Sequence, residues 1–219
     1  MKMTSLLIVA LQIYTSLAVL GIDLSAKHDD FQCFKKNGYQ FAITRAYRSY
    51  GAVDPDGYQN LEKAKAAGLI GDVYFFPCKG KKTAKSQVQE FVQLFGNQQT
   101  QVYGTVWVDV ESNPSTDCGW TNDYGSNCNF LQELVNELKG NSKSVGIYAS
   151  QYMWTSIFGS ASACSHFSSL PLWYPHYDQT PTFDDFPKYK FGGWTTPSIK
   201  QYSGTTSVCG VGVDLNYYK

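Results

Sequence analysis

Acidic side chains end three apolar segments of this chain, and two of them stand only two residues apart. Asp109 and Glu111 close the segment Val106-Trp107-Val108-Asp109-Val110-Glu111. On a β-strand they would share one face with Trp107, their backbones roughly 6.6 Å apart. Carboxyl groups this close do not titrate independently, and the one in drier surroundings has its pKa raised. A protonated carboxyl group beside an ionised one is the pair that general acid catalysis needs at neutral or mildly acidic pH.

Two further carboxylates follow the same rule. Asp23 ends the run that begins at Val19, and Asp214 follows Val211-Gly212-Val213. Ligand sites of parallel α/β folds form at the carboxyl ends of the strands, so all four acids are predicted to converge on one rim. A structural alternative stays open, in which the acids cap helices or pair with Arg45 and with lysines at the rim.

The elements that must position these acids alternate along the chain up to Tyr148. Apolar residues recur at i, i+3, i+4 and i+7 in two segments, Val88–Phe95 and Leu131–Leu138, which predicts amphipathic helices. Gly68, Gly96 and Gly140 are predicted helix ends. The expected buried strands are Val19–Leu24, Phe41–Ala46, Val73–Phe76, Val106–Val110 and Val145–Tyr148.

Beyond about residue 160 the pattern changes, because Pro, Gly and Ser rather than helices separate the strand-like segments. These segments are Leu170–Tyr177, Phe191–Tyr202 and Val211–Tyr218. The fold class predicted is therefore α/β, an irregular TIM-like (β/α) barrel. It would have about five parallel βα units followed by short antiparallel C-terminal strands, in one domain over residues 19–219.

Composition narrows the function classes. The 219 residues carry 18 Lys plus Arg and 18 Asp plus Glu, and 43% of them are apolar. The charges are scattered, which predicts no nucleic-acid partner. One basic cluster, Lys79, Lys81, Lys82 and Lys85, is either a solvated face or an attractor for an anionic polymer. No nucleophile elbow is present, and the distant His28, His166 and His176 predict neither a metal site nor a cofactor.

The N-terminus and the cysteines indicate an oxidising compartment. Residues 1–18 combine Lys2, an apolar run from Leu6 to Leu11 and a small-residue end at Ala18, the pattern of a signal peptide too short to span a bilayer. The mature part holds an even number of cysteines, which predicts three disulfides with unknown pairing, although Cys118 and Cys128 could close a local loop. They are Cys33, Cys78, Cys118, Cys128, Cys164 and Cys209.

Six segments in register resemble glycoside hydrolase family 25, the lysozymes that act as N-acetylmuramidases, and the tail from Pro171 to Tyr218 resembles the short secreted eukaryotic branch. The resemblance covers essentially the whole mature chain. The segments are Gly21–Ser25, Val106–Glu111, Val145–Tyr148, Leu172–Tyr174, Gln201–Ser203 and Val213–Asn216.

The resemblance implies hydrolysis of the β-1,4 bond between N-acetylmuramic acid and N-acetylglucosamine in bacterial peptidoglycan. By the same resemblance Glu111 is the proton donor and Asp109 the partner carboxylate that holds the acetamido group, with Asp23 and Asp214 in the cleft. It places Tyr74, Tyr148, Trp173, Tyr174 and Gln201 at the substrate. Many bacterial members of the family read Tyr-His-Phe where this chain has Tyr74-Phe75-Phe76.

The function predicted is therefore a secreted, monomeric lysozyme, exported or delivered to a phagosomal or lysosomal lumen, that serves antibacterial defence or the digestion of bacteria. A catalytically inactive barrel that binds peptidoglycan or chitin is the alternative from another class, suggested by an aromatic content of 16%. A chitinase would differ only in substrate. No membrane insertion is expected.

Overall fold

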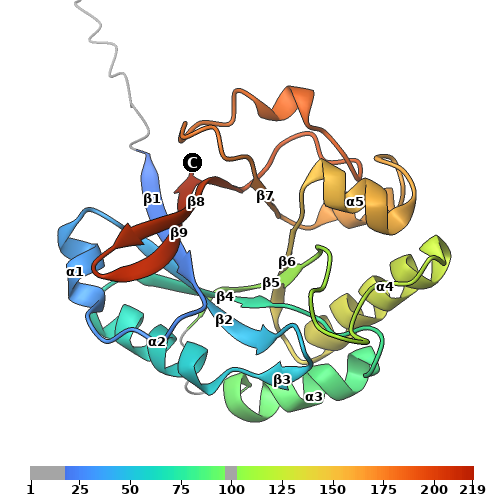
Figure 1. Cartoon of the computed structure of the whole chain (residues 1–219), viewed down its shortest axis with the longest axis horizontal. Helices are drawn as coiled ribbons and strands as arrows, with labels where there is room; N and C mark the ends of the chain where they lie inside the picture. Colours follow the sequence, from blue (N-terminus) through green and yellow to red (C-terminus); the bar gives the residue numbers. More distant parts are fainter. Residues whose placement is uncertain (1–17, 97–102) are drawn as a thin grey trace, which may run out of the picture.

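Eight β-strands close into a barrel in the computed structural model, which describes residues 18–96 and 103–219. The signal peptide expected at residues 1–18 lies outside this range except for its last residue. The barrel order is β1-β9-β8-β7-β6-β5-β4-β2, and a parallel pairing of β1 with β2 closes it (Figure 1). These strands are β1 (Val19–Leu24), β2 (Phe41–Arg48), β4 (Ile70–Phe75), β5 (Thr105–Asp109), β6 (Ser144–Tyr148), β7 (Leu172–Pro175), β8 (Ile199–Val208) and β9 (Val211–Tyr218).

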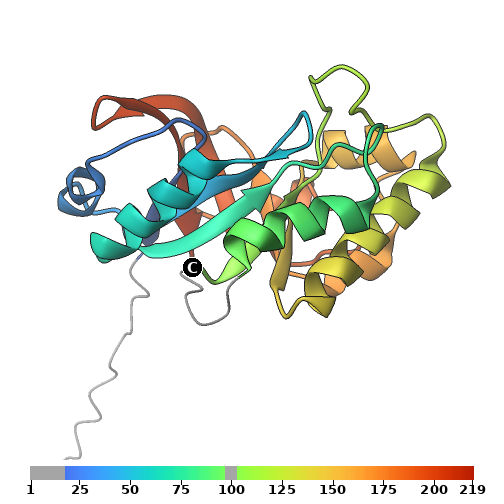
Figure 2. The same cartoon turned by 90° about the horizontal axis from the view of Figure 1, so that it is seen from below.

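Helices cover the outside of the barrel, and β3 (Ala52–Val53) extends β2 beyond it. Figure 2 shows α2, α3 and α4 side by side along one flank. The helices are α1 (Phe31–Lys36), α2 (Pro55–Ala66), α3 (Ala84–Phe95), α4 (Tyr124–Gly140) and α5 (Gln151–Phe158), with short 3-10 turns at Ser165–Ser169 and Phe186–Lys188. The two predicted apolar stripes are the buried faces of α3 and α4. In the described residues no helix is long and apolar enough to cross a membrane.

The direction of the C-terminal strands corrects one expectation. β7 pairs with β6, and β8 with β7, in parallel, whereas only β9 is antiparallel to both of its neighbours. Antiparallel strands are therefore the wrong prediction for β7 and β8. The segment between these strands contains a 3-10 turn instead of an α-helix, and it is long enough to carry the chain back for a parallel crossover.

Strand alternation divides the core into two layers. Val106 and Val108 of β5 pack against the helices, and Trp107 points into the barrel with Tyr148 and Trp173. Trp107 fits there because Gly146 of the adjacent strand has no side chain: a Cβ at this position would stand 2.4 Å from the indole ring. The packed interior forms the floor on which the rim residues stand.

Three disulfides join Cys33 to Cys209, Cys78 to Cys118 and Cys128 to Cys164. The local closure of Cys118 with Cys128 is therefore wrong. These two residues begin and end a stretch that leads into α4, and each faces a different neighbouring segment: Cys118 faces the loop after β4, and Cys128 on α4 faces the loop after α5.

The bond between Cys33 and Cys209 should contribute most to stability, because its partners are 176 residues apart in the sequence. In the chain-entropy model this cross-link contributes about 5 kcal/mol, against about 4 kcal/mol for the bond between Cys128 and Cys164. We expect Cys33→Ala/Cys209→Ala to lower the free energy of unfolding in urea by several kcal/mol. A loss below about 1 kcal/mol would contradict this expectation.

Candidate active site

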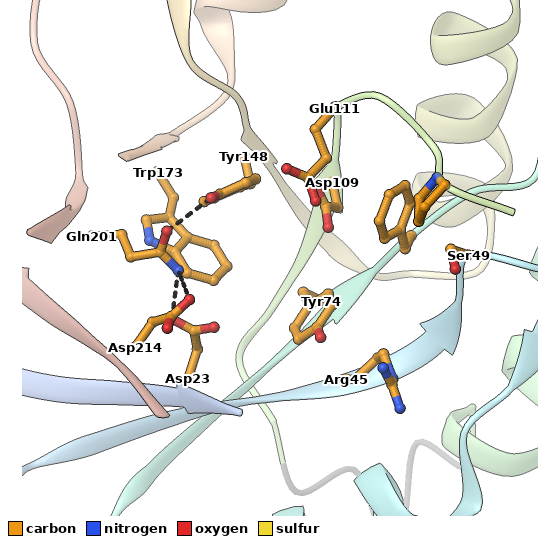
Figure 3. Close-up of a pocket in the computed structure, with 12 residues that line it drawn as sticks. Asp23, Arg45, Ser49, Tyr74, Asp109, Glu111, Tyr148, Trp173, Gln201 and Asp214 are labelled. Carbon is orange, nitrogen blue, oxygen red and sulfur yellow. Dashed lines mark hydrogen bonds between the residues drawn. The ribbon is translucent and has the colours of Figure 1, made fainter. Parts of the chain in front are cut away.

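A polar cavity of about 270 Å³ opens at the carboxyl ends of the parallel barrel strands, and Asp214 reaches it from the amino-terminal half of the antiparallel β9 (Figure 3). All four predicted acids reach it, from three different strands and the residues that follow one of them. The residues that line it are Asp23, Arg45, Ser49, Tyr74, Phe76, Asp109, Glu111, Pro114, Tyr148, Trp173, Gln201 and Asp214. The expected convergence on one rim is confirmed as geometry.

Asp109 and Glu111 stand above Trp107, as strand alternation predicts. Asp109 is the last residue of β5 and only 5% exposed, while Glu111 follows the strand and is half-buried. The Oδ1 atom of Asp109 is buried without a hydrogen-bond partner in the described residues. The indole Nε1 of Trp120 donates to the Glu111 carbonyl at 2.9 Å and so fixes the backbone of the proposed proton donor.

Asp23 is held by amide donors from the last two strands. Its Oδ2 accepts hydrogen bonds from Nε2 of Gln201 and from Nδ2 of Asn216, both at 2.8 Å. Asn216 is oriented in turn by Nε1 of Trp173, which donates to its Oδ1 at 2.8 Å. Asp23 is thus fixed from β8 and β9 and, through Asn216, by Trp173 of β7.

Gln201 is the centre of this polar network. Its Nε2 also donates to Oδ2 of Asp214 at 3.2 Å, while its Oε1 accepts from the hydroxyl groups of Tyr148 and Tyr177, each at 2.8 Å. The backbone N–H of Thr205 donates to the other oxygen of Asp214 at 2.6 Å. The amide therefore has one orientation in which both donors and acceptors are satisfied.

Removing the hydroxyl groups of Tyr148 and Tyr177 should weaken activity cooperatively. Either hydroxyl alone keeps the Gln201 amide oriented, so we expect each single Tyr→Phe variant to lower kcat/KM about two- to tenfold. The double variant leaves a buried carbonyl oxygen unpaired and should lose more than the product of the two single effects. Initial rates on a soluble glycan measure this cycle, and strictly multiplicative losses would count against it.

Burial raises the pKa of every acid in the cavity. The pKa of Asp23 rises to about 8 through burial first and the charge of Asp214 second, against hydrogen bonds from Asn216 and Gln201. Burial and the charges of Glu111 and Asp23 hold the pKa of Asp109 well above its ordinary value. Burial, then Asp214, raises the pKa of Glu111, and burial raises that of Asp214. At neutral pH the cluster therefore carries protons that exposed carboxylates would have lost.

Tyr174 does not belong to this site, which corrects the sequence prediction. It follows Trp173 on β7, so it points to the opposite side of the strand, packs against Phe186 and donates its hydroxyl to Asp185 at 2.8 Å. Phe75 likewise faces the helices and stacks on Tyr47, while its neighbours Tyr74 and Phe76 line the cavity. The position of the bacterial histidine is thus outside the cavity in this chain.

Sequence reasoning missed the role of Tyr177. The sequence predicts a strand-like segment up to Tyr177, but β7 ends at Pro175, so Tyr177 lies in the loop after it and donates its hydroxyl to Gln201. Arg45 lines the cavity, as its expected place at the rim implies, but its ion pair is with Asp54 and not with the four acids. The strand pattern of β2 could have placed Arg45 on the interior face, since it alternates with Ile43.

The basic cluster is largely engaged within the protein. Lys82 pairs with Glu90, Lys81 lies 3.8 Å from Asp117, and Lys79 donates to the hydroxyl groups of Thr121 and Ser126. These contacts favour a structural role for this cluster over attraction of an anionic polymer.

One group in the described residues has the ligand types of a metal site, namely His176, Asp178 and Asp185. The buried ammonium group of Lys200 already donates to Asp178 at 2.7 Å and to Asp185 at 2.8 Å. The ammonium group of Lys200 therefore occupies the position that a metal cation would take. Its ion pairs with Asp178 and Asp185 anchor the loop after β7.

A closed barrel whose rim gathers carboxyl groups of raised pKa in one polar cavity has the architecture and the chemistry of a glycoside hydrolase. Comparison with known proteins narrows this class. The family model Lysozyme-like protein 1 matches residues 14–202. Probable GH family 25 lysozyme 2 of Dictyostelium discoideum is 40% identical over 204 residues, which is 92% of this chain and 91% of that protein.

Lysozyme-like protein 5 of Caenorhabditis elegans is also 40% identical, over 90% of both chains. Among solved structures, a family GH25 lysozyme from Aspergillus fumigatus superimposes with a TM-score of 0.75 at 25% identity and covers 92% of this chain and 94% of its own. The chain belongs to the glycoside hydrolase family 25 lysozymes, and it is an enzyme of that class.

Proposed function

We propose that the protein is a secreted lysozyme that cleaves the β-1,4 bond between N-acetylmuramic acid and N-acetylglucosamine in bacterial peptidoglycan. The observation that carries the proposal is the pair Asp109 and Glu111, two carboxyl groups in one cavity whose pKa values are raised by burial and by the charges of neighbouring acids. Glycoside cleavage needs a proton for the leaving oxygen and negative charge at the anomeric centre.

Glu111 is the proton donor in this mechanism. Its raised pKa keeps the carboxyl group protonated to a higher pH than an exposed glutamate, and Trp120 holds the backbone that carries it. The proton passes to the glycosidic oxygen as the bond to the anomeric carbon breaks. After bond cleavage the ionised Glu111 accepts a proton from the incoming water.

Asp109 supplies the negative charge. Its unpartnered Oδ1 is available to accept the N–H of the sugar's acetamido group, and a donor at this atom favours the ionised form. The positive charge that develops on the sugar ring favours ionisation further, so the same step that draws the proton from Glu111 stabilises the charge on Asp109. Asp214 lines the same cleft, and Asp23, whose pKa is about 8, stays protonated at mildly acidic pH.

The three disulfides support export into an oxidising compartment, as does the signal-like pattern of residues 1–18. We propose that the protein acts as a monomer outside the cell or in a phagosomal or lysosomal lumen, where wall hydrolysis serves either defence against bacteria or their digestion.

Mass-spectrometric identification of the fragments released from purified peptidoglycan tests this function. We expect products with a new reducing end at N-acetylmuramic acid. Reducing ends at N-acetylglucosamine would contradict the proposed bond, and faster digestion of chitin oligomers would identify a chitinase. Binding to peptidoglycan without new reducing ends would identify the inactive barrel.

A further inference from the structure

The cavity that gathers four carboxyl groups also contains one guanidinium group, that of Arg45. Among the described residues that line the cavity it is the only cationic side chain, and it is 27% exposed. In Figure 3 Tyr74 lies between Arg45 and the pair Asp109 and Glu111. Arg45 forms an ion pair with Asp54 and with none of the four acids, so it does not neutralise the carboxyl groups of the cavity.

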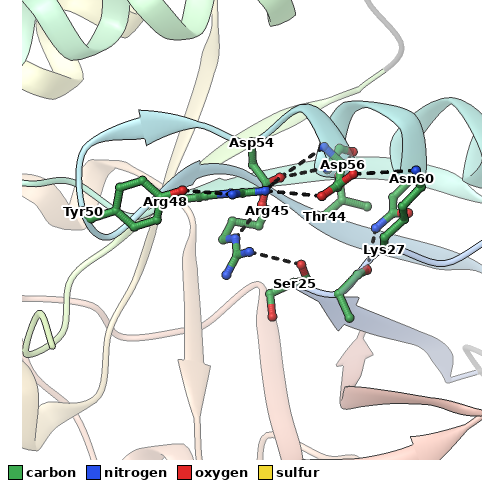
Figure 4. Close-up of polar contacts among 11 residues, drawn as sticks. Ser25, Lys27, Thr44, Arg45, Arg48, Tyr50, Asp54, Asp56 and Asn60 are labelled. Carbon is green, nitrogen blue, oxygen red and sulfur yellow. Dashed lines mark hydrogen bonds and ion pairs between the residues drawn. The ribbon is translucent and has the colours of Figure 1, made fainter. Parts of the chain in front are cut away.

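Two hydrogen bonds hold the guanidinium group of Arg45 in place (Figure 4). Its Nε donates to Oδ2 of Asp54 at 2.7 Å, and one Nη donates to the carbonyl oxygen of Ser25 at 3.2 Å. Asp54 is completely buried, accepts N–H groups at the start of α2 and also pairs with Arg48 at 2.7 Å. Burial opposes the charge of Asp54, but hydrogen bonds from Arg48 and Arg45 outweigh it and keep its pKa below the ordinary value.

The charges around Asp54 do not cancel. Arg45, Arg48 and Lys27 supply three positive charges, whereas Asp54 and Asp56 supply two negative ones. Guanidinium carries five N–H donors, and the described residues accept from two atoms of Arg45, with no partner at its other Nη. A pre-oriented cation with donors to spare thus borders the substrate cavity.

We propose that Arg45 is a specificity-determining residue that binds a carboxylate on the glycan chain. The inference rests on the proposed function and deepens it, because a carboxylate is what separates peptidoglycan from chitin. In peptidoglycan it comes either from the lactyl group of muramic acid or from the peptide attached there. A guanidinium group matches a carboxylate in geometry and charge, and the neutral sugars of chitin offer no such partner.

Three glycans distinguish the sources: peptidoglycan strands with intact peptides, strands stripped by an amidase so that every lactyl group is a free carboxylate, and stripped strands whose carboxylates are converted to methyl amides. We expect Arg45→Gln to lower kcat/KM at least ten times more on one of the two carboxylate-bearing glycans than on the methyl amide. Arg45→Lys should restore part of this preference. Loss confined to stripped strands identifies the lactyl carboxylate, and loss confined to intact strands identifies the peptide.

Arg48→Gln is the matched control, because Arg48 also pairs with Asp54 but does not line the cavity. It also removes a positive charge beside Asp54. The ratio of its rates on the carboxylate-bearing glycans to its rate on the methyl amide should stay unchanged, whatever happens to the midpoint of thermal unfolding. Equal losses on all three glycans in Arg45→Gln would overturn the inference while leaving the lysozyme activity in place. A parent enzyme that cleaves none of them would instead overturn the proposed function.

Discussion

Replacing Glu111 by Gln is expected to lower kcat on peptidoglycan by about two to four orders of magnitude while the protein stays folded. Glutamine keeps the size of the side chain and can still hydrogen-bond, but it has no acidic proton to give to the glycosidic oxygen. KM should change little, since the loss falls on the transition state. Initial rates of release of reducing ends, measured beside the thermal unfolding midpoint, give both quantities.

The control for this variant is Glu133→Gln, the same chemical change on the exposed face of α4. It should clear a suspension of bacterial walls at the parent rate. If Glu111→Gln also did so, Glu111 would not be the proton donor, and the acid would have to be sought among the other three carboxyl groups of the cavity.

The central geometry of the site could be predicted from the sequence because it depends on a two-residue period. Once Val106 to Asp109 is a buried strand, Trp107 and Asp109 must share the inner face and the valines the outer one. The same alternation, applied to β7, would have excluded Tyr174 from the cavity. The placement of Tyr174 at the substrate rested on the family motif and not on the alternation of side chains along the strand.

The remaining features depend on contacts between segments far apart in the chain. Tyr177 and Gln201 meet across the space between a loop and β8, and Cys33 meets Cys209 from opposite ends of the described chain. Neither contact can be predicted from the local sequence, because the hydrophobic pattern of each segment is complete without the distant partner. The parallel direction of β8 is equally non-local, since it depends on the path of the whole preceding loop.

The cavity also bears on stability. Acids in solvent ionise freely, but those in this barrel are buried beside one another, so folding at neutral pH must leave them protonated or charged at close range. Sites of this kind commonly reduce stability for the sake of activity. The barrel, the disulfides and the ion pairs of Asp54 and Lys200 stabilise the fold against this effect.

Replacing Asp23 by Asn should therefore stabilise the protein at alkaline pH while reducing its activity. The ordinary pKa of an aspartate is 3.8 and that of Asp23 in the fold is about 8, so between these values the folded state binds more protons than the unfolded state. The free energy of unfolding then falls as pH rises through this window. Asparagine has no charge to bury, and its carbonyl oxygen can still accept from Gln201 and Asn216, which both donate to one oxygen of Asp23.

We expect the gain in unfolding free energy for Asp23→Asn to be on the order of 5 kcal/mol at pH 8 and to vanish below pH 4. Urea titrations at a series of pH values measure it. Asp54→Asn supplies a control of opposite sign: the pKa of Asp54 is lowered in the fold, so this variant should lose stability at neutral pH and lose less as the pH falls below 3.8. A gain for Asp23→Asn that did not depend on pH would contradict this explanation. Only the titration of the Asp23 carboxyl group can make the stabilities of the parent and the variant differ more as the pH rises.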